Sequence, residues 1–164
     1  MPPVVDADCV AEDLGVDALL LAESAASEPA SADRLKLYQS VSNVAAHYRT
    51  TGPEIVAEIG NRSPDAFVHG VGTGGPITGV GRVLRELRPD VRIVAVEPEK
   101  SAVLSGGPPG EHRIDGIGAG FVPAILDRSV LSEVRQISEA DAQRVKLELA
   151  RREGSAIAER YDPR

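Results

Sequence analysis

Cysteine and aromatic residues are scarce in this chain of 164 residues. Cys9 is the single cysteine, so the chain cannot form an internal disulfide or a metal cluster of cysteine thiolates. This low cysteine content predicts a cytoplasmic protein. Cys9 stands in a polar stretch without a neighbouring histidine, which disfavours a role as nucleophile. Because only 3% of the residues are aromatic and tryptophan is absent, the core must be built from Val, Ile, Leu and Ala.

Basic clusters and long apolar runs are missing as well. The formal net charge is -7, whereas a protein that binds a nucleic-acid backbone needs clustered Lys and Arg. The longest apolar run, residues 18–22, is far shorter than the ~20 residues that a membrane span requires. The N-terminus shows no signal-like pattern. The composition therefore predicts neither a nucleic-acid nor a membrane partner, but it allows one small phosphate held by backbone amides.

The patterns along the chain predict an α/β fold with a parallel sheet and flanking helices. Short apolar runs predict strands over residues 65–70, 91–97 and 131–137. The second of these is too apolar in its second half to lie at the edge of a sheet. A helix between the first two strands completes a βαβ unit, which implies that these strands are parallel.

Three helices are predicted from caps and apolar spacing. Thr50 caps the first, and Gly60 ends it with Ile55 and Ile59 on one face. The second has an apolar stripe of Ile77, Val80, Leu84 and Leu87, and ends before Pro89-Asp90. The third begins at a capping box, residues 138–141, directs Val145 and Leu149 inward, and ends at Gly154. Between the second and third strands lies a long Gly/Pro-rich segment, Ser105–Gly120, of a kind that is often functional.

The glycine-rich stretch Gly70–Pro76 lies between the first strand and the second helix, which makes it a candidate anion site. Glycines let the backbone turn with positive φ and approach a ligand closely. The first N–H groups of the following helix have no internal acceptor, and together with the helix dipole they suit a phosphate.

Two interpretations of this loop remain open on the residues alone. Gly70, Gly72 and Gly75 match the dinucleotide-binding fingerprint, and Glu97 ends the next strand where such a site places its ribose-binding acid. The plain alternative for Glu97 is a solvated carboxylate at a strand end. The second interpretation is the phosphate of a cofactor other than a dinucleotide.

The wider sequence favours the second interpretation, because it resembles cysteine synthase (O-acetylserine sulfhydrylase), a pyridoxal-phosphate enzyme of fold type II. The matching segments occur in one order: Thr50–Ile55, Gly70–Gly75, Ile77–Arg82, Val96–Pro98, Ser101–Gly107 and His112–Phe121. The resemblance implies a partial phosphate-binding α/β domain over residues 39–154. Residues 1–38 are then a poorly matched helical and linker segment, and residues 155–164 a divergent tail. We expect a truncated or degenerate form that retains about half of the family's fold.

The resemblance also assigns site residues. The family's phosphate loop maps onto Gly72, Thr73, Gly74, Gly75 and Pro76. The family has threonine where this chain has Pro76, which offers neither a backbone N–H nor a hydroxyl. Losing a hydrogen bond to a charged acceptor costs about 1.5–3 kcal/mol, or roughly a ten- to hundred-fold loss of phosphate affinity. The family's Gly-Ile-Gly-Ala-Gly loop at the mouth of the active site maps onto Gly116, Gly118 and Gly120.

The catalytic lysine of the family has no counterpart in this chain. In the family it holds pyridoxal phosphate as a Schiff base and removes the α-proton of O-acetylserine. Acetate then leaves, and sulfide adds to give cysteine. The lysines here are Lys36, Lys100 and Lys146, and none stands in the family's lysine motif. The family's asparagine loop for the substrate carboxylate is also missing, although Asn43 aligns with another family asparagine. We therefore predict no catalytic residue and little sulfhydrylase activity from this chain alone.

Two other roles are alternatives to that of a truncated cysteine-synthase-like protein. The resemblance implies an O-acetylserine-like substrate if the chain is active, a homodimer, and binding to serine acetyltransferase, so a non-catalytic interaction module is one alternative. A small dinucleotide-binding domain is another. The three histidines, His47, His69 and His112, lack a carboxylate and a nucleophile at informative spacing. Ordinary packing or surface roles are favoured for them, although His69 precedes the loop and is a minor candidate for a phosphate contact. No metal site is predicted.

Overall fold

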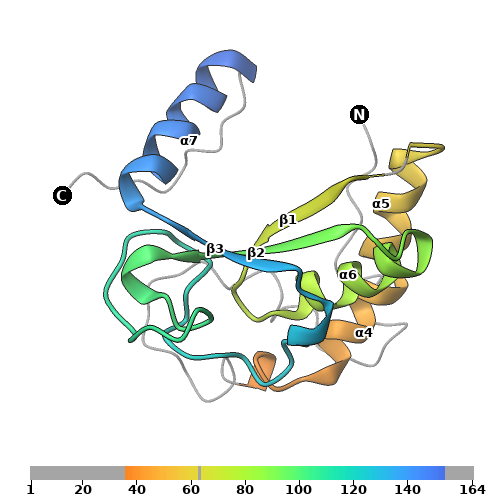
Figure 1. Cartoon of the computed structure of the whole chain (residues 1–164), viewed down its shortest axis with the longest axis horizontal. Helices are drawn as coiled ribbons and strands as arrows, with labels where there is room; N and C mark the ends of the chain where they lie inside the picture. Colours follow the sequence, from red (N-terminus) through yellow and green to blue (C-terminus); the bar gives the residue numbers. More distant parts are fainter. Residues whose placement is uncertain (1–35, 63, 154–164) are drawn as a thin grey trace.

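The computed structural model describes residues 36–62 and 64–153, and within the last helix it describes no side chain for residues 149, 150, 152 and 153. Most of the predicted segment 1–38, with Cys9, lies outside the described residues, and so do the tail 155–164 and the helix end at Gly154. The remainder is an α/β structure with a parallel sheet, as the sequence predicts (Figure 1).

Three parallel strands form the sheet in the order β1 (Ala66–Gly70), β2 (Arg92–Pro98) and β3 (Glu133–Ile137). All three predicted strands are confirmed, and β2 is central, as its apolar second half indicates. β3 begins two residues later than predicted. A short 3-10 turn, η2 (Arg128–Val130), precedes it, and the Leu131 N–H still belongs to this turn, since it donates to the Arg128 carbonyl (3.2 Å). Another such turn, η1 (Glu99–Ser101), follows β2.

Helices α4 (Val41–Arg49), α5 (Thr51–Ile59) and α6 (Gly75–Leu87) gather on one side of the sheet (Figure 1). α5 and α6 confirm two predicted helices. Thr50 precedes α5 as predicted, but its hydroxyl donates to the carbonyl of Ala46 (3.0 Å) and does not cap α5. The buried core cluster consists only of Val, Ile, Leu and Ala, namely Val71, Ile77, Val80, Leu84, Val91, Ile93, Ala95, Leu104 and Leu126.

Two apolar positions are more exposed than their spacing predicts. Leu87 is 51% exposed because it is the last residue of α6 and lies beyond the buried part of the stripe formed by Ile77, Val80 and Leu84. Val145 is 50% exposed, so its predicted inward position is wrong. The reason is the placement of α7 (Glu139–Glu153), which projects from the end of β3 away from the other helices (Figure 1). The side chain of Leu149 lies outside the described residues.

The start of α7 confirms the predicted cap. The Asp141 N–H donates to Ser138 Oγ (3.1 Å), and the Ser138 hydroxyl donates to the Asp141 carboxylate (2.8 Å). Arg144 also donates to Asp141 (3.0 Å). Hydrogen bonds from Arg144 and then Ser138 lower the pKa of the Asp141 carboxyl group.

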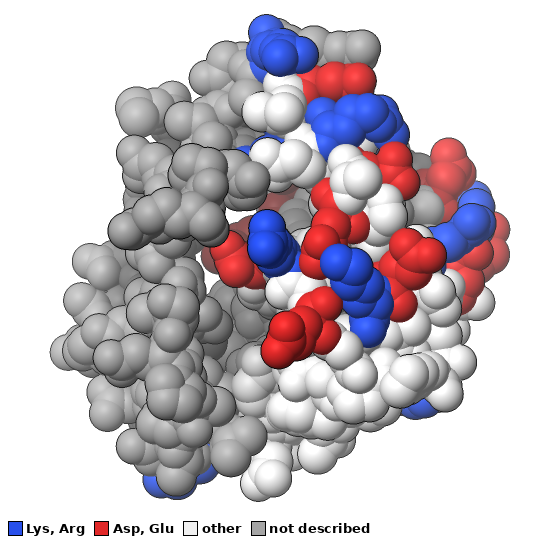
Figure 2. Space-filling model, turned by 90° about the vertical axis from the view of Figure 1, so that its left-hand side faces the viewer, with Lys and Arg blue, Asp and Glu red and all other residues white. Residues whose placement is uncertain are grey.

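Charged side chains of both signs are interspersed over the upper and middle part of the described face in Figure 2, and the lower part of this face is largely uncharged. Ion pairs such as Lys100–Glu139 (2.9 Å) and Arg82–Asp127 (2.8 Å) tie opposite charges together. No described helix is long and apolar enough to cross a bilayer. Within the described residues, no group of three or more His, Cys, Asp or Glu side chains could hold a metal ion.

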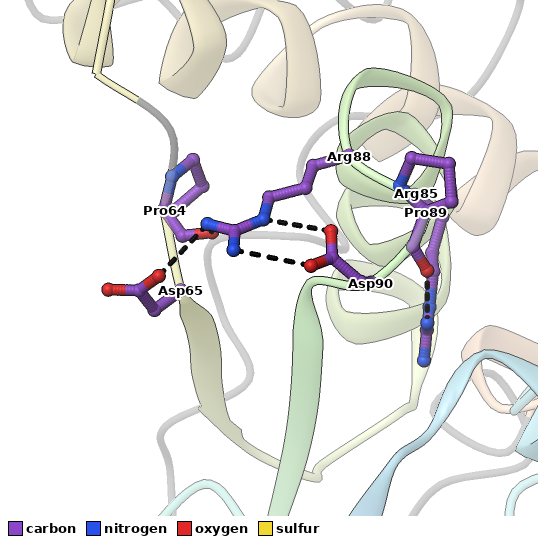
Figure 3. A network of polar contacts seen from close by, with 6 residues as sticks. All are labelled: Pro64, Asp65, Arg85, Arg88, Pro89 and Asp90. Carbon is purple, nitrogen blue, oxygen red and sulfur yellow. Dashed lines mark hydrogen bonds and ion pairs between the residues drawn. The ribbon is translucent and has the colours of Figure 1, made fainter.

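A polar network fixes the turn between α6 and β2 to the start of β1 (Figure 3). The Arg88 guanidinium donates to Asp90 (2.9 Å) in the turn, and to Asp65 (2.9 Å) and the Pro64 carbonyl (3.2 Å) before β1. The hydrogen bond from Arg88 lowers the pKa of the Asp90 carboxyl group. Arg85 donates to the Pro89 carbonyl (2.6 Å). The network thus joins the start of β1 to the turn that leads into β2. The glycine loop lies at the opposite end of these strands.

Candidate phosphate site

The glycine loop lies at the carboxyl edge of the sheet, between β1 and α6. Beyond the end of β1, the Val71 N–H donates to the Val96 carbonyl (2.9 Å) and keeps the chain paired with β2. Gly74 then adopts the left-handed conformation (φ 86°) immediately before the helix, a geometry that favours glycine. Gly75 is the first residue of α6, and Pro76 follows in the first turn. The structure therefore confirms the predicted order of strand, loop and helix.

The loop presents several backbone donors that the fold leaves unused. The N–H groups without an acceptor among the described residues are those of Gly72, Thr73, Gly74 and Ile77. The Gly75 N–H makes only a long hydrogen bond to Thr73 Oγ1 (3.3 Å). Such unpaired donors at a helix N-terminus, with the helix dipole, attract an anion. The residues present thus fit a phosphate group, with the exception of Pro76, which has no N–H to offer.

A buried amide lies against the first residue of the helix. Asn43 of α4 is 7% exposed, and its Oδ1 atom is buried without a hydrogen-bond partner. A Cβ atom built on Gly75 would overlap Oδ1, so position 75 has no room for a side chain while the Asn43 amide stays in this place. An unsatisfied buried polar atom costs about 1–3 kcal/mol and calls for an explanation.

The second predicted site segment lies beside the glycine loop. The Gly118 N–H donates to the Val71 carbonyl (3.1 Å), and a Cβ atom on Gly72 would lie 2.5 Å from the Gly116 carbonyl oxygen. The remaining position of the predicted set, Gly120, has positive φ (81°), as do Gly116 (81°) and Gly118 (68°). The structure therefore brings together two loops that lie some forty residues apart in the chain.

His112 holds the second loop in place. Its Nδ1 atom accepts a hydrogen bond from the Ile114 N–H (3.3 Å), so the ring proton must reside on Nε2, which donates to the Gly118 carbonyl (2.9 Å). The long segment Ser105–Gly120 contains no helix or strand, as predicted, but hydrogen bonds fix part of it. No local pattern in the sequence predicts this positioning role of His112.

Glu97 has neither of the two roles that the sequence suggests. It is 1% exposed, and its carboxylate accepts hydrogen bonds from the N–H groups of Leu104 (2.7 Å) and Ser105 (3.0 Å) and from the Ser105 hydroxyl (2.5 Å). A carboxylate engaged in this way is neither solvated nor free to bind a ribose. The residue instead anchors the start of the segment that leads to the second loop.

The other two histidines lie between α4 and β1. His47 Nδ1 is 3.0 Å from Thr51 Oγ1, while the ring of His69 stacks on Phe67 (5.7 Å between centroids). Burial lowers the pKa of both imidazoles, and the nearby His69 lowers that of His47 further. Both are thereby favoured in the neutral form. The predicted packing roles agree with these contacts. An interaction with the backbone of Gly70, the first residue of the glycine loop, raises the pKa of His69 and opposes the effect of burial.

The three lysines of the chain, Lys36, Lys100 and Lys146, all lie outside the glycine loop in the sequence. Lys100 Nζ pairs with Glu139 (2.9 Å) at the start of α7. Lys146 lies on α7, which projects away from the sheet. Lys36 is the first described residue. The glycine loop itself contains no lysine, and its backbone has the features of a phosphate cradle.

Comparisons with known proteins agree with this geometry. The profile of a family described as "Pyridoxal-phosphate dependent enzyme" matches residues 6–159. A cysteine synthase from Staphylococcus aureus is 41% identical over 117 residues, and cysteine synthase 3 from Caenorhabditis elegans is 48% identical over 116 residues. Each alignment covers 71% of this chain. The crystal structure of a cysteine synthase from Entamoeba histolytica superposes with a TM-score of 0.68 at 37% identity, over 72% of this chain.

The shared region is a minor part of each relative. The chain spans 38% of the S. aureus protein and 34% each of the C. elegans protein and the E. histolytica structure.

Proposed function

This chain belongs to the pyridoxal-phosphate dependent enzyme family, and from this premise we propose that its glycine loop binds the phosphate of pyridoxal 5'-phosphate. The residues assigned to this role are Gly72, Thr73, Gly74, Gly75 and Pro76. The observation that carries the proposal is the set of unpaired backbone N–H groups where the loop enters α6. Four such donors and the helix dipole can hold a small anion although the chain as a whole is acidic.

Pro76 weakens this site relative to one that has threonine at the same position. Threonine adds a backbone N–H and a hydroxyl to the first turn of the helix, whereas proline adds neither. Each lost donor to a charged acceptor lowers the affinity roughly ten- to hundred-fold. Proline is nevertheless comfortable in a first helical turn, and α6 forms with Pro76 in place.

The loop of Gly116, Gly118 and Gly120 is proposed to cover one side of the bound cofactor. Its contact with Val71 and Gly72 places it next to the phosphate loop, and His112 fixes its central residue. In this position it excludes water and orients a ligand, and it supplies no acid or base of its own.

The whole-protein activity proposed from the relatives is that of a cysteine synthase acting on an O-acetylserine-like substrate. Pyridoxal phosphate supplies the electron sink for removal of an α-proton. The residues assigned to the two glycine loops bind and orient it, and none of them has a side chain that can act as a base. The proposed role of this polypeptide is therefore the phosphate-binding half of such an enzyme, with little activity of its own.

The purified 164-residue polypeptide, supplied with pyridoxal phosphate, O-acetylserine and sulfide, is expected to form no cysteine above the rate of the protein-free mixture. The physical reason is the missing lysine, which in the family both holds the cofactor covalently and removes the proton. The assay measures cysteine by a colorimetric reaction, with an intact family cysteine synthase as the positive control. Cysteine formation that scales with the concentration of this polypeptide would contradict the proposal.

A second candidate role, as an interaction module, is favoured by α7. Val145 (50% exposed) and Leu147 (44% exposed) present apolar surface on a helix that projects from the sheet. Such surface suits contact with another polypeptide, whether a second copy in a homodimer or serine acetyltransferase. The dinucleotide alternative has lost its support, because Glu97 is buried and fully bonded.

A further inference from the structure

The buried side chain of Asn43, beside the glycine loop, makes no hydrogen bond within the described part of the fold. Asn43 is the third residue of α4, and the described residues provide no hydrogen-bond partner for either atom of its carboxamide. Its Oδ1 atom is fully buried, and the residue as a whole is 93% removed from solvent (7% exposed). An apolar side chain of the same size would fill this place without an unpaired polar group.

The carboxamide of Asn43 faces the first turn of α6. A Cβ atom built on Gly75 would overlap Oδ1 and lie 2.6 Å from Cγ and 3.4 Å from Nδ2. The whole amide group therefore packs on the backbone of Gly75, at the helix end where the N–H groups of Gly74 and Ile77 have no acceptor. Glycine at this position allows the amide to approach the helix end.

The amide can present either an acceptor or a donor to this place. A half-turn about the Cβ–Cγ bond exchanges Oδ1 with Nδ2 and hardly alters the shape of the side chain. Against the backbone of Gly75 alone, neither orientation is satisfied. An anion at the helix end changes this, because its oxygens accept from Nδ2 as well as from the backbone N–H groups.

We propose that Asn43 is a phosphate-binding residue whose Nδ2 atom donates a hydrogen bond to the anion held at the N-terminus of α6. The side chain adds a donor to a helical turn in which Pro76 contributes none. The ligand class is a phosphate monoester, and inorganic phosphate shares the chemistry that is recognised. This inference rests on the proposed function, since it requires that the glycine loop bind a phosphate.

The sequence offers a direct spectroscopic test. The chain contains two asparagines, Asn43 and Asn61, so selective 15N labelling of asparagine side chains yields two amide signals. Asn61 is exposed beyond the end of α5 and serves as the internal control. On titration with pyridoxal 5'-phosphate or inorganic phosphate, the Nδ2 signals of Asn43 are expected to shift and those of Asn61 to stay. Pyridoxal, which lacks the phosphate, is expected to move neither.

Two outcomes overturn the inference in different ways. In a second, uniformly 15N-labelled sample the backbone amide of Gly74 is observed as well. If phosphate shifts this amide but not the side chain of Asn43, the loop binds phosphate and Asn43 has no part in it. If phosphate shifts neither signal, the proposed phosphate site fails as well, and the inference fails with it.

A matched pair of variants gives an independent measurement. Asn43→Leu keeps the branched shape of the side chain and removes its donor, so the affinity for pyridoxal 5'-phosphate is expected to fall about ten-fold or more. Asn61→Leu, the control, is expected to bind as the wild type does. Binding by a folded Asn43→Leu variant with wild-type affinity would overturn the inference. Circular dichroism reports the folding of each variant, and the spectroscopic test requires no variant at all.

Discussion

Replacing Glu97 by alanine is expected to lower the free energy of unfolding by about 2–4 kcal/mol, because it both opens a cavity and leaves buried hydrogen-bond donors without an acceptor. The side chain is fully buried, so its removal leaves a cavity next to Leu104. The N–H groups of Leu104 and Ser105 and the Ser105 hydroxyl also lose their acceptor. A urea unfolding curve followed by circular dichroism measures this change in the free energy of unfolding.

Two further variants separate these causes. Glu97→Gln keeps the shape, but it replaces one accepting oxygen by an NH₂ group that faces the same donors, so a smaller loss than for alanine is expected. Glu99→Ala removes an exposed carboxylate two residues away and is expected to change the stability little. An alanine variant at 97 that unfolds at the same urea concentration as Glu99→Ala would refute the anchoring role of this carboxylate.

The second large effect is expected at Gly75, where an alanine should destabilise the fold by about 1–3 kcal/mol through overpacking. The new methyl group would overlap the amide oxygen of Asn43, which leaves α4 and α6 no room to pack as they do. The double variant Gly75→Ala with Asn43→Ala is expected to recover part of the loss, since it removes the group that collides. Thermal unfolding of the two single variants and the double variant gives the coupling energy.

A glycine in the same helix provides the control. A Cβ atom on Gly81 would meet Ile93 Cγ2 at 3.5 Å, an ordinary contact distance, so Gly81→Ala is expected to be neutral or stabilising. Two results would contradict this account: Gly75→Ala being no more destabilising than Gly81→Ala, or the double variant being no more stable than Gly75→Ala alone. Either would mean that the contact with Asn43 of α4 does not constrain position 75.

Local patterns in the sequence predict the part of the fold that positions the glycine loop. The apolar runs before and after the loop, with helical spacing of Ile77, Val80 and Leu84 between them, suffice to predict a parallel βαβ unit. The same patterns fail where burial depends on partners distant in sequence. Spacing places Val145 on an apolar face of α7, but only the structure shows that none of the other described helices covers that face.

The candidate site shows the same division. Glycine spacing between a strand and a helix predicts the loop and its unpaired donors, because both follow from local backbone geometry. The burial of Glu97 is not predictable in this way, since the backbone N–H groups that donate to its carboxylate belong to a loop without periodicity. The contact of Asn43 with Gly75 depends on how α4 crosses α6, and no local sequence signal encodes it.

The affinity of the chain for pyridoxal 5'-phosphate, compared with its affinity for pyridoxal, shows whether the glycine loop is a phosphate site. Equilibrium dialysis of both compounds against the wild-type chain and Pro76→Thr gives four constants. The phosphate ester is expected to bind more tightly than pyridoxal and to be displaced by inorganic phosphate. Pro76→Thr should strengthen its binding roughly ten- to hundred-fold by restoring a donor, without affecting pyridoxal. Equal binding of the two compounds, unaffected by inorganic phosphate and by Pro76→Thr, would contradict a phosphate site in this loop.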